Sequence, residues 1–463
     1  MDKRTMKLEG KYIYRTMCCA ILAILATGSF FYVWFKFVEQ NNQTGHLTGI
    51  GNLVMAAGIY VALYIILGKG LRAFRIGVDR KAHLLASQVL TLFSTDALEI
   101  LISCAITGQF RYFTEFLSRY FLLFLVQSIA LCFLIIPLVN RYRKTFPPLQ
   151  ILEVYGDRGN ALENKINGRP DKYHVARTVN IAEGFDKVYS AMTNYDAVLI
   201  NDIQAEQKNK ILKECFRCDK RVYFTPKISD IISKRAEEIN LFDTPLYLCR
   251  NNGISPIQLA FKRFLDILFS LVGLVLTSPI LLVTAIAIKL EDGGPVFFRQ
   301  ERATLDGKKF SILKFRSMIV NAEQDGRPHP AGENDDRITK VGRVIRSTRI
   351  DELPQLINII KGDMSLVGPR PERIEHVRKY MEDIPEFSFR LKVKAGLTGP
   401  AQVFGMYSTQ PLDKLKMDLF YITNYSLLLD IQIIFETVKI LFQKDSTTGF
   451  SEEQQKEMHD ADI

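Results

Sequence analysis

The stretch Tyr120–Asn140, YFLLFLVQSIALCFLIIPLVN, contains 21 residues and no charged side chain. A helix needs about 20 apolar residues to cross the hydrocarbon core of a membrane, so this stretch predicts a transmembrane helix. Met17–Phe35 and Leu47–Gly68 have the same character, with 19 and 22 uncharged residues. The sequence therefore predicts a membrane protein. Its apolar content and lack of a repeat exclude collagen-like, coiled-coil and disordered classes.

A fourth apolar segment, Leu84–Ile106, differs because it carries Asp96 and Glu99. At a spacing of three residues, the two acids share one helical face. Acids in a membrane helix face other helices or mark a functional site. We expect a structural role and leave a functional site as the alternative.

Lys and Arg are unevenly distributed among the loops that flank these apolar segments. The loop Glu39–His46 has no Lys or Arg, and the loop Thr107–Arg119 has only Arg111 and Arg119. Because cytoplasmic loops carry the excess of basic residues, the N-terminus and everything after residue 140 should be cytoplasmic, with the protein in the bacterial inner or plasma membrane. The basic clusters are Lys3, Arg4, Lys7, Lys11 and Arg15; Lys69, Arg72, Arg75, Arg80 and Lys81; and Arg141, Arg143 and Lys144.

The whole chain is basic, with 60 Lys and Arg against 50 Asp and Glu and a formal charge of +10. This balance suits an anionic partner, which can be a phosphorylated substrate, an anionic lipid or a nucleic acid. Seven cysteines in 463 residues do not form a disulfide framework.

Pro147-Pro148 ends the last apolar helix and opens a soluble stretch. Its strand-like segments alternate with helical patterns, which predicts an α/β domain with a parallel sheet. The turn Gly156–Gly159 has two glycines where a dinucleotide fingerprint has three, so we expect no bound nucleotide. Cys215 and Cys218 lack the second pair of a zinc site. The expected strands are Leu149–Tyr155, Ala197–Ile200, Val222–Thr225 and Pro245–Cys249.

The run Ile267–Ile288 contains 22 residues without a charge and has Ser278-Pro279 at its middle. Proline removes a backbone donor and bends a helix. A bent helix can enter and leave on the same membrane face, whereas a tolerated kink leaves an ordinary fifth span. The pattern alone leaves both readings open.

The block from Gly294 to Phe442 carries the features typical of chemistry. Closely spaced Arg and Lys residues suit phosphate oxygens, although a solvated or lipid-facing basic surface gives the same pattern. Asp351-Glu352 follows several of these cations, so we expect the ionised forms of both acids to be favoured. An ionised Asp can attack phosphorus and Glu can hold Mg²⁺, while acids in the first turn of a helix are the structural alternative. In Gly368-Pro369-Arg370-Pro371, two prolines give one Arg a rigid base.

These features lie in a longer ordered pattern, in which Lys262–Phe442 resembles the catalytic domain of the bacterial polyprenyl-phosphate sugar-1-phosphate transferases. The four apolar helices and the α/β domain resemble the larger members, the undecaprenyl-phosphate glucose or galactose phosphotransferases, in organisation. The motifs are GPVFFRQER (Gly294–Arg302), KFRSM (Lys314–Met318), DDRITKVGRVIR (Asp335–Arg346), DELPQL (Asp351–Leu356), KGDMSLVGPRPE (Lys361–Glu372) and AGLTGPAQV (Ala395–Val403).

The resemblance assigns roles to individual residues. Asp351 falls on the nucleophile and Glu352 on its partner acid, both near Mg²⁺. Ser278-Pro279 matches the break of a re-entrant helix at about 264–290, which favours re-entry. Three positions depart from the family pattern: Ala395, Ile350 and Val403-Phe404-Gly405. The basic residues assigned to substrate or phosphate binding are Lys314, Arg316, Arg346, Arg370 and Arg299.

The implied organisation is four transmembrane helices (1–146), a cytoplasmic Rossmann-like α/β domain (147–252) and a mostly helical monotopic catalytic domain (253–463). The implied reaction moves a hexose 1-phosphate from a UDP-sugar, with UDP-glucose or UDP-galactose as leading donors, to undecaprenyl phosphate. It releases UMP through an aspartyl intermediate and uses Mg²⁺, as the first membrane step of capsule, exopolysaccharide or O-antigen synthesis. Membrane lipids are expected partners, a homodimer is left open, and nucleic acid is not expected.

Two other functions fit the sequence less well. A non-catalytic scaffold or regulator of polysaccharide assembly would have lost Asp351 or Glu352, and both are present. A transporter, indicated only by Asp96 and Glu99, would show inverted hydropathy repeats, and none is visible.

Overall fold

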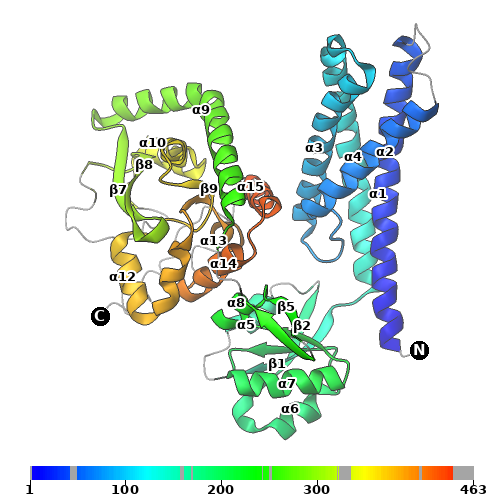
Figure 1. Cartoon of the computed structure of the whole chain (residues 1–463), viewed down its shortest axis with the longest axis vertical. Helices are drawn as coiled ribbons and strands as arrows, with labels where there is room; N and C mark the ends of the chain where they lie inside the picture. The colour runs from blue at the N-terminus through cyan, green and yellow to red at the C-terminus, as the bar shows by residue number, and fades with distance from the viewer. Residues whose placement is uncertain are drawn as a thin grey trace. The chain divides into compact units, whose positions relative to one another are not determined.

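The computed structural model describes residues 3–41, 50–156, 161–167, 170, 172–241, 243–249, 253–320, 322, 335–405 and 409–441. The chain divides into two compact units, Met1–Thr225 and Pro226–Ile463, and each is described by itself (Figure 1).

The first unit begins with the N-terminal bundle, by which we mean four long helices and a short 3-10 turn. Helix α1 packs on α2 and α4, and α3 packs on the same two helices. Aromatic rings fill the core, where Phe30 stacks on Tyr60 with ring centroids 4.3 Å apart, while large apolar side chains such as Phe133 and Leu122 point outward. The elements are α1 (Lys3–Asn41), α2 (Ile50–Gly70), α3 (Lys81–Thr107), η1 (Phe110–Tyr112) and α4 (Phe113–Thr145).

The α/β part of the first unit is built on a four-stranded parallel sheet with the order β2-β1-β3-β4. Three of the expected strands are confirmed as β1, β3 and β4. Strand β2 escaped prediction because only two of its side chains, Val175 and Val179, are buried along an edge of the sheet. The elements are β1 (Leu149–Tyr155), α5 (Ala161–Asn167), β2 (Tyr173–Asn180), η2 (Ile181–Glu183), α6 (Phe185–Met192), β3 (Ala197–Asn201), α7 (Ala205–Arg217) and β4 (Arg221–Phe224).

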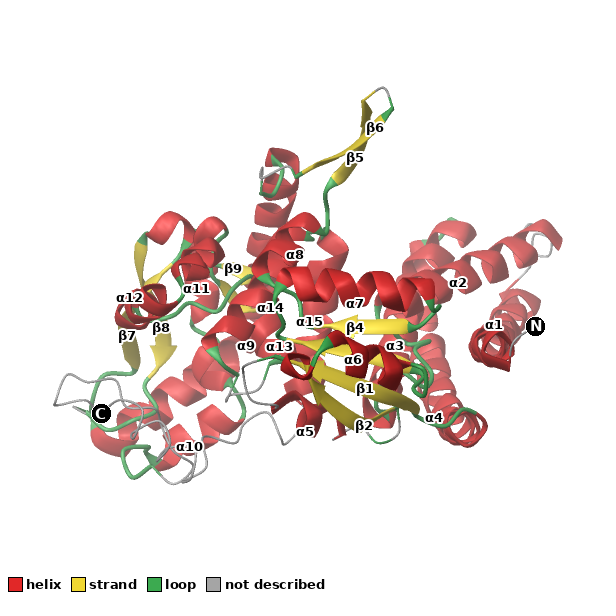
Figure 2. Cartoon of the chain, turned by 90° about the horizontal axis from the view of Figure 1, so that it is seen from below, coloured by secondary structure: helices red, strands yellow, loops and turns green. Residues whose placement is uncertain are grey.

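The strand expected at Pro245–Cys249 exists as β6 (Thr244–Leu248), but its expected place beside the other three strands was wrong. It pairs antiparallel with β5 (Glu237–Leu241) instead, and the two form a separate ribbon (Figure 2). Of the glycine turn after β1, Asp157–Gly159 lies outside the described residues.

The second unit starts before the expected boundary at residue 253. Helix α8 (Ile228–Ser233) packs on α14 (Pro411–Thr423), and Ile231 is buried in one apolar cluster with Leu415 and Leu419. The side chain of Ile231 thereby ties residues after 225 to this unit rather than to the α/β sheet.

Helix α9 (Pro256–Asp292) consists of two arms joined by a bend (Figure 1). The Ser255 hydroxyl accepts a hydrogen bond from the Gln258 amide and caps its start. Pro279 lies inside the helix. On the N-terminal side of Pro279, Leu274 packs in the apolar cluster that includes residues of α11. On the C-terminal side, Leu281 and Ala285 pack in the apolar cluster that includes Ile345 of α10. Most of α9 is exposed apolar surface, and it is one of five described helices long and apolar enough to cross a membrane.

The remaining elements surround two small sheets. Strands β7 and β8 form an antiparallel hairpin, and β9 and β10 pair in parallel. The second pairing needs glycine, because a Cβ atom on Gly396 would lie 2.1 Å from the Gly368 nitrogen. The elements are β7 (Phe297–Ala303), η3 (Leu305–Gly307), β8 (Lys309–Phe315), α10 (Lys340–Ser347), η4 (Ile350–Glu352), α11 (Gln355–Lys361), β9 (Ser365–Val367), α12 (Ile374–Asp383), η5 (Pro385–Lys392), β10 (Gly396–Thr398), α13 (Pro400–Phe404) and α15 (Leu427–Leu441).

Candidate active site

Asp351 and Glu352 lie in η4, the single turn between α10 and α11. Arg349, immediately before this turn, has a φ of 58° and a ψ of 17°. Non-glycine residues seldom adopt this left-handed conformation, and such strain concentrates at functional sites. The acids therefore lie on a sharply turned segment just before α11, and this position does not exclude the structural alternative of acids at the start of a helix.

Glu352 is held by two cations from distant parts of the second unit. Lys314 Nζ of β8 donates to Glu352 Oε1 at 2.8 Å, and an Arg370 guanidinium nitrogen donates to the same oxygen at 3.0 Å. The Lys314 and Glu352 side chains are 19% and 14% exposed, and Arg370 is 40% exposed. We call these three residues the Glu352 cluster.

The three residues of the Glu352 cluster shift one another's pKa values. Burial opposes ionisation of Glu352, but the charges of Lys314 and Arg370 outweigh it and hold the pKa of this carboxyl well below its usual range. Burial lowers the pKa of the Lys314 ammonium, and Glu352 partly restores it. The charge of Glu352 raises the pKa of Arg370. The expectation of a favoured carboxylate is thus confirmed for Glu352.

Asp351 behaves differently from its neighbour. Burial, and then the charge of Glu352, raise the pKa of the Asp351 carboxyl, although Lys314 and Arg346 act against this shift. The expectation that its ionised form would be favoured was wrong in direction, because the sequence does not reveal the burial of a side chain. Asp351 Oδ1 is buried and has no hydrogen-bond partner among the described residues.

Two of the predicted phosphate-binding residues lie elsewhere. The Arg316 guanidinium is buried in an ion pair with Asp292 at the end of α9, which joins that helix to β8. Arg299 is exposed and lies opposite Leu313 in the hairpin, whereas Phe298 lies opposite Lys314. Because neighbouring side chains in a strand point to opposite faces, Arg299 is on the other face of the hairpin from Lys314.

Arg346 ends α10 and acts on Asp351 through its charge. At the bend of α9, the Ser278 hydroxyl donates to the carbonyl of Val275 at 2.8 Å and is exposed.

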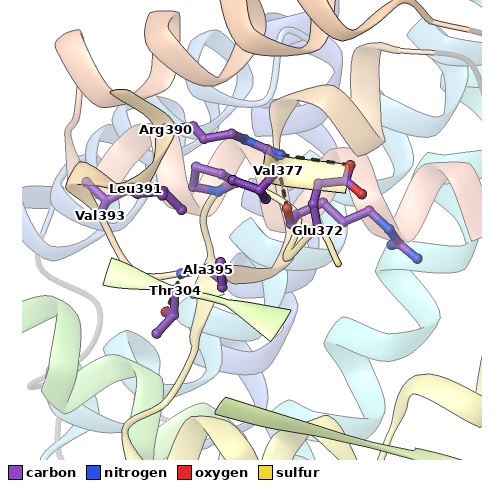
Figure 3. Close-up of a pocket in the computed structure, with 10 residues that line it drawn as sticks. Thr304, Glu372, Val377, Arg390, Leu391, Val393 and Ala395 are labelled. Atoms are coloured by element: carbon purple, nitrogen blue, oxygen red, sulfur yellow. Dashed lines mark hydrogen bonds and ion pairs between the residues drawn. The ribbon is translucent and has the colours of Figure 1, made fainter. Parts of the chain in front are cut away.

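A pocket adjoins Arg370, and the sequence analysis missed most of its residues (Figure 3). Arg390 donates two hydrogen bonds to Asp418, at 2.7 and 3.0 Å, and one to the backbone carbonyl of Arg370 at 3.0 Å. Figure 3 shows Arg390 and Glu372 turned toward each other, with 3.8 Å between their charged atoms. Arg390 therefore supports the segment that carries Arg370. Arg390 could not be predicted as a site residue, because no recognisable motif surrounds it in the sequence.

Ala395, one of the departures from the family pattern, also lines this pocket. Its backbone nitrogen donates to the Thr304 hydroxyl at 3.1 Å. Proline would have no such donor, so alanine allows a contact that proline would forbid.

Among the described residues, Asp351 and Glu352 are the side chains of this turn that could bind a metal ion. No group of three or more His, Cys, Asp or Glu side chains able to hold a metal occurs in the described ranges. Mg²⁺, however, is often bound by one or two carboxylates together with substrate phosphates. Asp351 Oδ1 is unpaired, and the contacts of Glu352 with described residues reach only Oε1. The donor set fits Mg²⁺ bound together with a phosphorylated substrate.

Comparison with known proteins gives a consistent set of relatives. Residues 257–444 match the family described as bacterial sugar transferase. The chain is 44% identical over 191 residues to the UDP-glucose:undecaprenyl-phosphate glucose-1-phosphate transferase of Caulobacter vibrioides, which covers 40% of this chain and 71% of the relative. It is 42% identical over 264 residues to a protein of the same name from Klebsiella pneumoniae, covering 55% and 54%.

A relative from Aeromonas hydrophila bears the name UDP-N-acetylgalactosamine-undecaprenyl-phosphate N-acetylgalactosaminephosphotransferase. It is 40% identical over 271 residues, which cover 57% of this chain and 62% of the relative. The chain thus spans about half the length of several curated relatives that it matches.

Proposed function

Because the chain belongs to the bacterial sugar transferase family, we propose that it transfers a sugar 1-phosphate from a UDP-sugar to undecaprenyl phosphate. The products are undecaprenyl-diphospho-sugar and UMP. The relatives from Klebsiella and Aeromonas are named for glucose and for N-acetylgalactosamine at 42% and 40% identity. Similarity of this degree does not choose between sugars, so the donor is proposed as the class of UDP-hexoses, with UDP-glucose and UDP-galactose tested first.

The observation that carries this proposal is the unpaired, buried oxygen of Asp351 beside the Glu352 cluster. A structural acid at this depth would be hydrogen-bonded. Glu352 binds Lys314 and Arg370 through one oxygen, while Asp351 Oδ1 has no described partner. This arrangement supports Asp351 as the nucleophile, because Glu352 neutralises Lys314 and Arg370 and holds them in place.

The proposed reaction has two displacements at one phosphorus atom. An Asp351 carboxylate oxygen attacks the sugar-bearing phosphorus of the donor, the bond from this phosphorus to the bridging oxygen breaks, and UMP leaves with the electron pair. An oxygen of undecaprenyl phosphate then attacks the same phosphorus. The bond to Asp351 breaks, which restores the carboxylate.

The surrounding cations have separate tasks in this scheme. Lys314 and Arg370 hold Glu352, and the partly exposed Arg370 also presents N–H donors toward phosphate oxygens. Bound Mg²⁺, held by Asp351 and Glu352 together with the donor, would neutralise charge on the diphosphate. Arg346 favours the carboxylate form of Asp351.

The membrane geometry follows the same proposal. Undecaprenyl phosphate places its phosphate at the headgroup level, and the apolar arms of α9 would lie at that depth as a re-entrant helix. The helices α1–α4 would cross the bacterial cytoplasmic membrane, with the site facing the cytoplasm. The reaction would then be the first membrane step of capsule, exopolysaccharide or O-antigen synthesis.

The test is to mix the purified full chain, Mg²⁺ and a panel of UDP-sugars labelled in the sugar, without lipid acceptor. We expect UMP in an amount equal to the enzyme, and label on the peptide that contains Asp351. Undecaprenyl phosphate should then discharge the label. Asp351→Asn is the negative control, and Glu301→Gln, which changes an exposed acid on the β7–β8 hairpin, is the matched active control. UMP release that requires the lipid, with no labelled peptide, would point to direct transfer instead.

A further inference from the structure

One face of α3 carries a line of buried polar side chains. These residues recur every three or four positions, which places them on a single helical face. Their exposed fractions are 3% or less, in a bundle that is otherwise packed with apolar and aromatic groups. The line consists of Ser87, Gln88, Thr91, Thr95, Asp96, Glu99 and Ser103.

Asp96 is connected to the neighbouring helices by a chain of hydrogen bonds. Gln127 Nε2 of α4 donates to the Tyr60 hydroxyl of α2 at 3.1 Å. The Tyr60 hydroxyl lies 2.9 Å from Asp96 Oδ1 and 3.2 Å from Gln127 Oε1, so it can donate its single proton to either oxygen. Asp96 Oδ2 is buried with no hydrogen-bond partner among the described residues.

Glu99, one turn further along α3, has fewer hydrogen-bond partners among the described residues than Asp96. Its side chain is fully buried, and neither carboxyl oxygen has a hydrogen-bond partner in the described part of the chain. Tyr120 of α4 points its hydroxyl toward Ser103 at 2.7 Å rather than toward Glu99. The acid therefore lies in the bundle without the donors that a carboxylate requires.

The groups that face the two acids carry no positive charge. The Tyr60 hydroxyl contacts Asp96 from α2, and Tyr120 of α4 lies near both acids. Gln127 of α4 bonds to Tyr60 and donates to the Ala26 carbonyl and the Ser29 hydroxyl of α1. No described Lys, Arg or His forms an ion pair with either acid.

Two carboxylates in this setting would be costly. Burying an unpaired ion costs several kcal/mol after relaxation, and like charges one helical turn apart repel each other. A proton removes one charge and supplies the donor that the unpartnered oxygens lack. It also needs no cavity, unlike a metal ion.

We propose that Asp96 and Glu99 form a proton-binding site inside the N-terminal bundle, in which the pair holds at least one proton that exchanges with water through the polar line of α3. This site is separate from the chemistry proposed for Asp351, and the function of the family does not require it.

The test is infrared difference spectroscopy of the full chain in lipid nanodiscs, comparing wild type with Glu99→Gln, Asp96→Asn and the double variant. We expect the wild type to show a C=O stretching band of a protonated carboxyl group that the double variant lacks. The band should shift in D₂O and fade as the pH is raised. The single variants show which acid carries the proton.

Trp34 controls for folding, because it is the single tryptophan of the chain and is buried in the same bundle. Unchanged Trp34 emission in each variant shows that the bundle is intact. If no band distinguishes the wild type from the double variant, both acids are ionised and the proposal fails. A band that neither D₂O nor pH alters also overturns it, since the proton would then be sealed in. Loss of the band on replacing choline chloride with sodium chloride would assign the site to a metal cation instead.

Discussion

Replacing Glu352 by Gln removes the single anion of the Glu352 cluster while keeping the size of the side chain. Lys314 Nζ and Arg370 then lose a partner that lies 2.8 and 3.0 Å away. Removing one member of a buried ion pair costs about 3–5 kcal/mol. Because Arg370 is 40% exposed and can turn to water, we take the lower end, about 3 kcal/mol, for local stability.

This loss should be visible in amide hydrogen exchange of β8 and α11, which flank the cluster. A cost of about 3 kcal/mol corresponds to exchange roughly 10²-fold faster through local opening. UMP release should fall by about 10²–10⁴-fold, the range for removing a polar catalytic group. The acid limb of the remaining activity should move to lower pH, because a charge that raises the pKa of Asp351 is gone.

The matched control is Glu301→Gln on the β7–β8 hairpin, which also carries Lys314. Glu301 pairs with Lys309 at 3.9 Å, and the side chains are 70% and 58% exposed. An exposed pair contributes about 0–1 kcal/mol, so exchange and UMP release should stay near wild type. If Glu352→Gln behaves like this control in both measurements, Glu352 does not organise the site, and the reasoning from its contacts is refuted.

Asp351→Asn should abolish UMP release with and without lipid, since an amide is a very poor nucleophile; retained single-turnover release would exclude Asp351 as the attacking group. In the wild type, attack requires the carboxylate, and burial raises its pKa above that of an ordinary Asp, so a pH–rate profile should lose activity as pH falls through this raised value. Pro279→Ala should straighten α9 and lower transfer to the lipid; a variant with wild-type rates would show that the bend is dispensable. A truncated chain starting at residue 226 should keep its activity, whereas one starting at residue 253 loses α8 and should melt at a lower temperature; equal melting would argue against the packing of α8 on α14.

Much of the local structure was predictable because it depends on neighbouring residues alone. Five long apolar helices follow from runs such as Tyr120–Asn140, and five such helices occur among the described residues. Strands β1, β3 and β4 follow from short apolar runs between turn residues. Strand β2 does not, since an edge strand with two buried side chains has almost no apolar signal.

The family, the acids at 351 and 352 and the basic residues around them could be predicted from the chain alone, because ordered motifs and residue types do not depend on folding. Which cations contact Glu352 could not, because it depends on packing between distant segments. Lys314 is 38 residues away and Arg370 is 18, and both arrive through strand packing. Arg299 and Arg316 have the same chemistry, yet the pleat of β7 turns one to the opposite face and Asp292 holds the other. Side-chain direction and burial depend on contacts between distant segments, and these also separate the pKa values of two adjacent carboxyl groups.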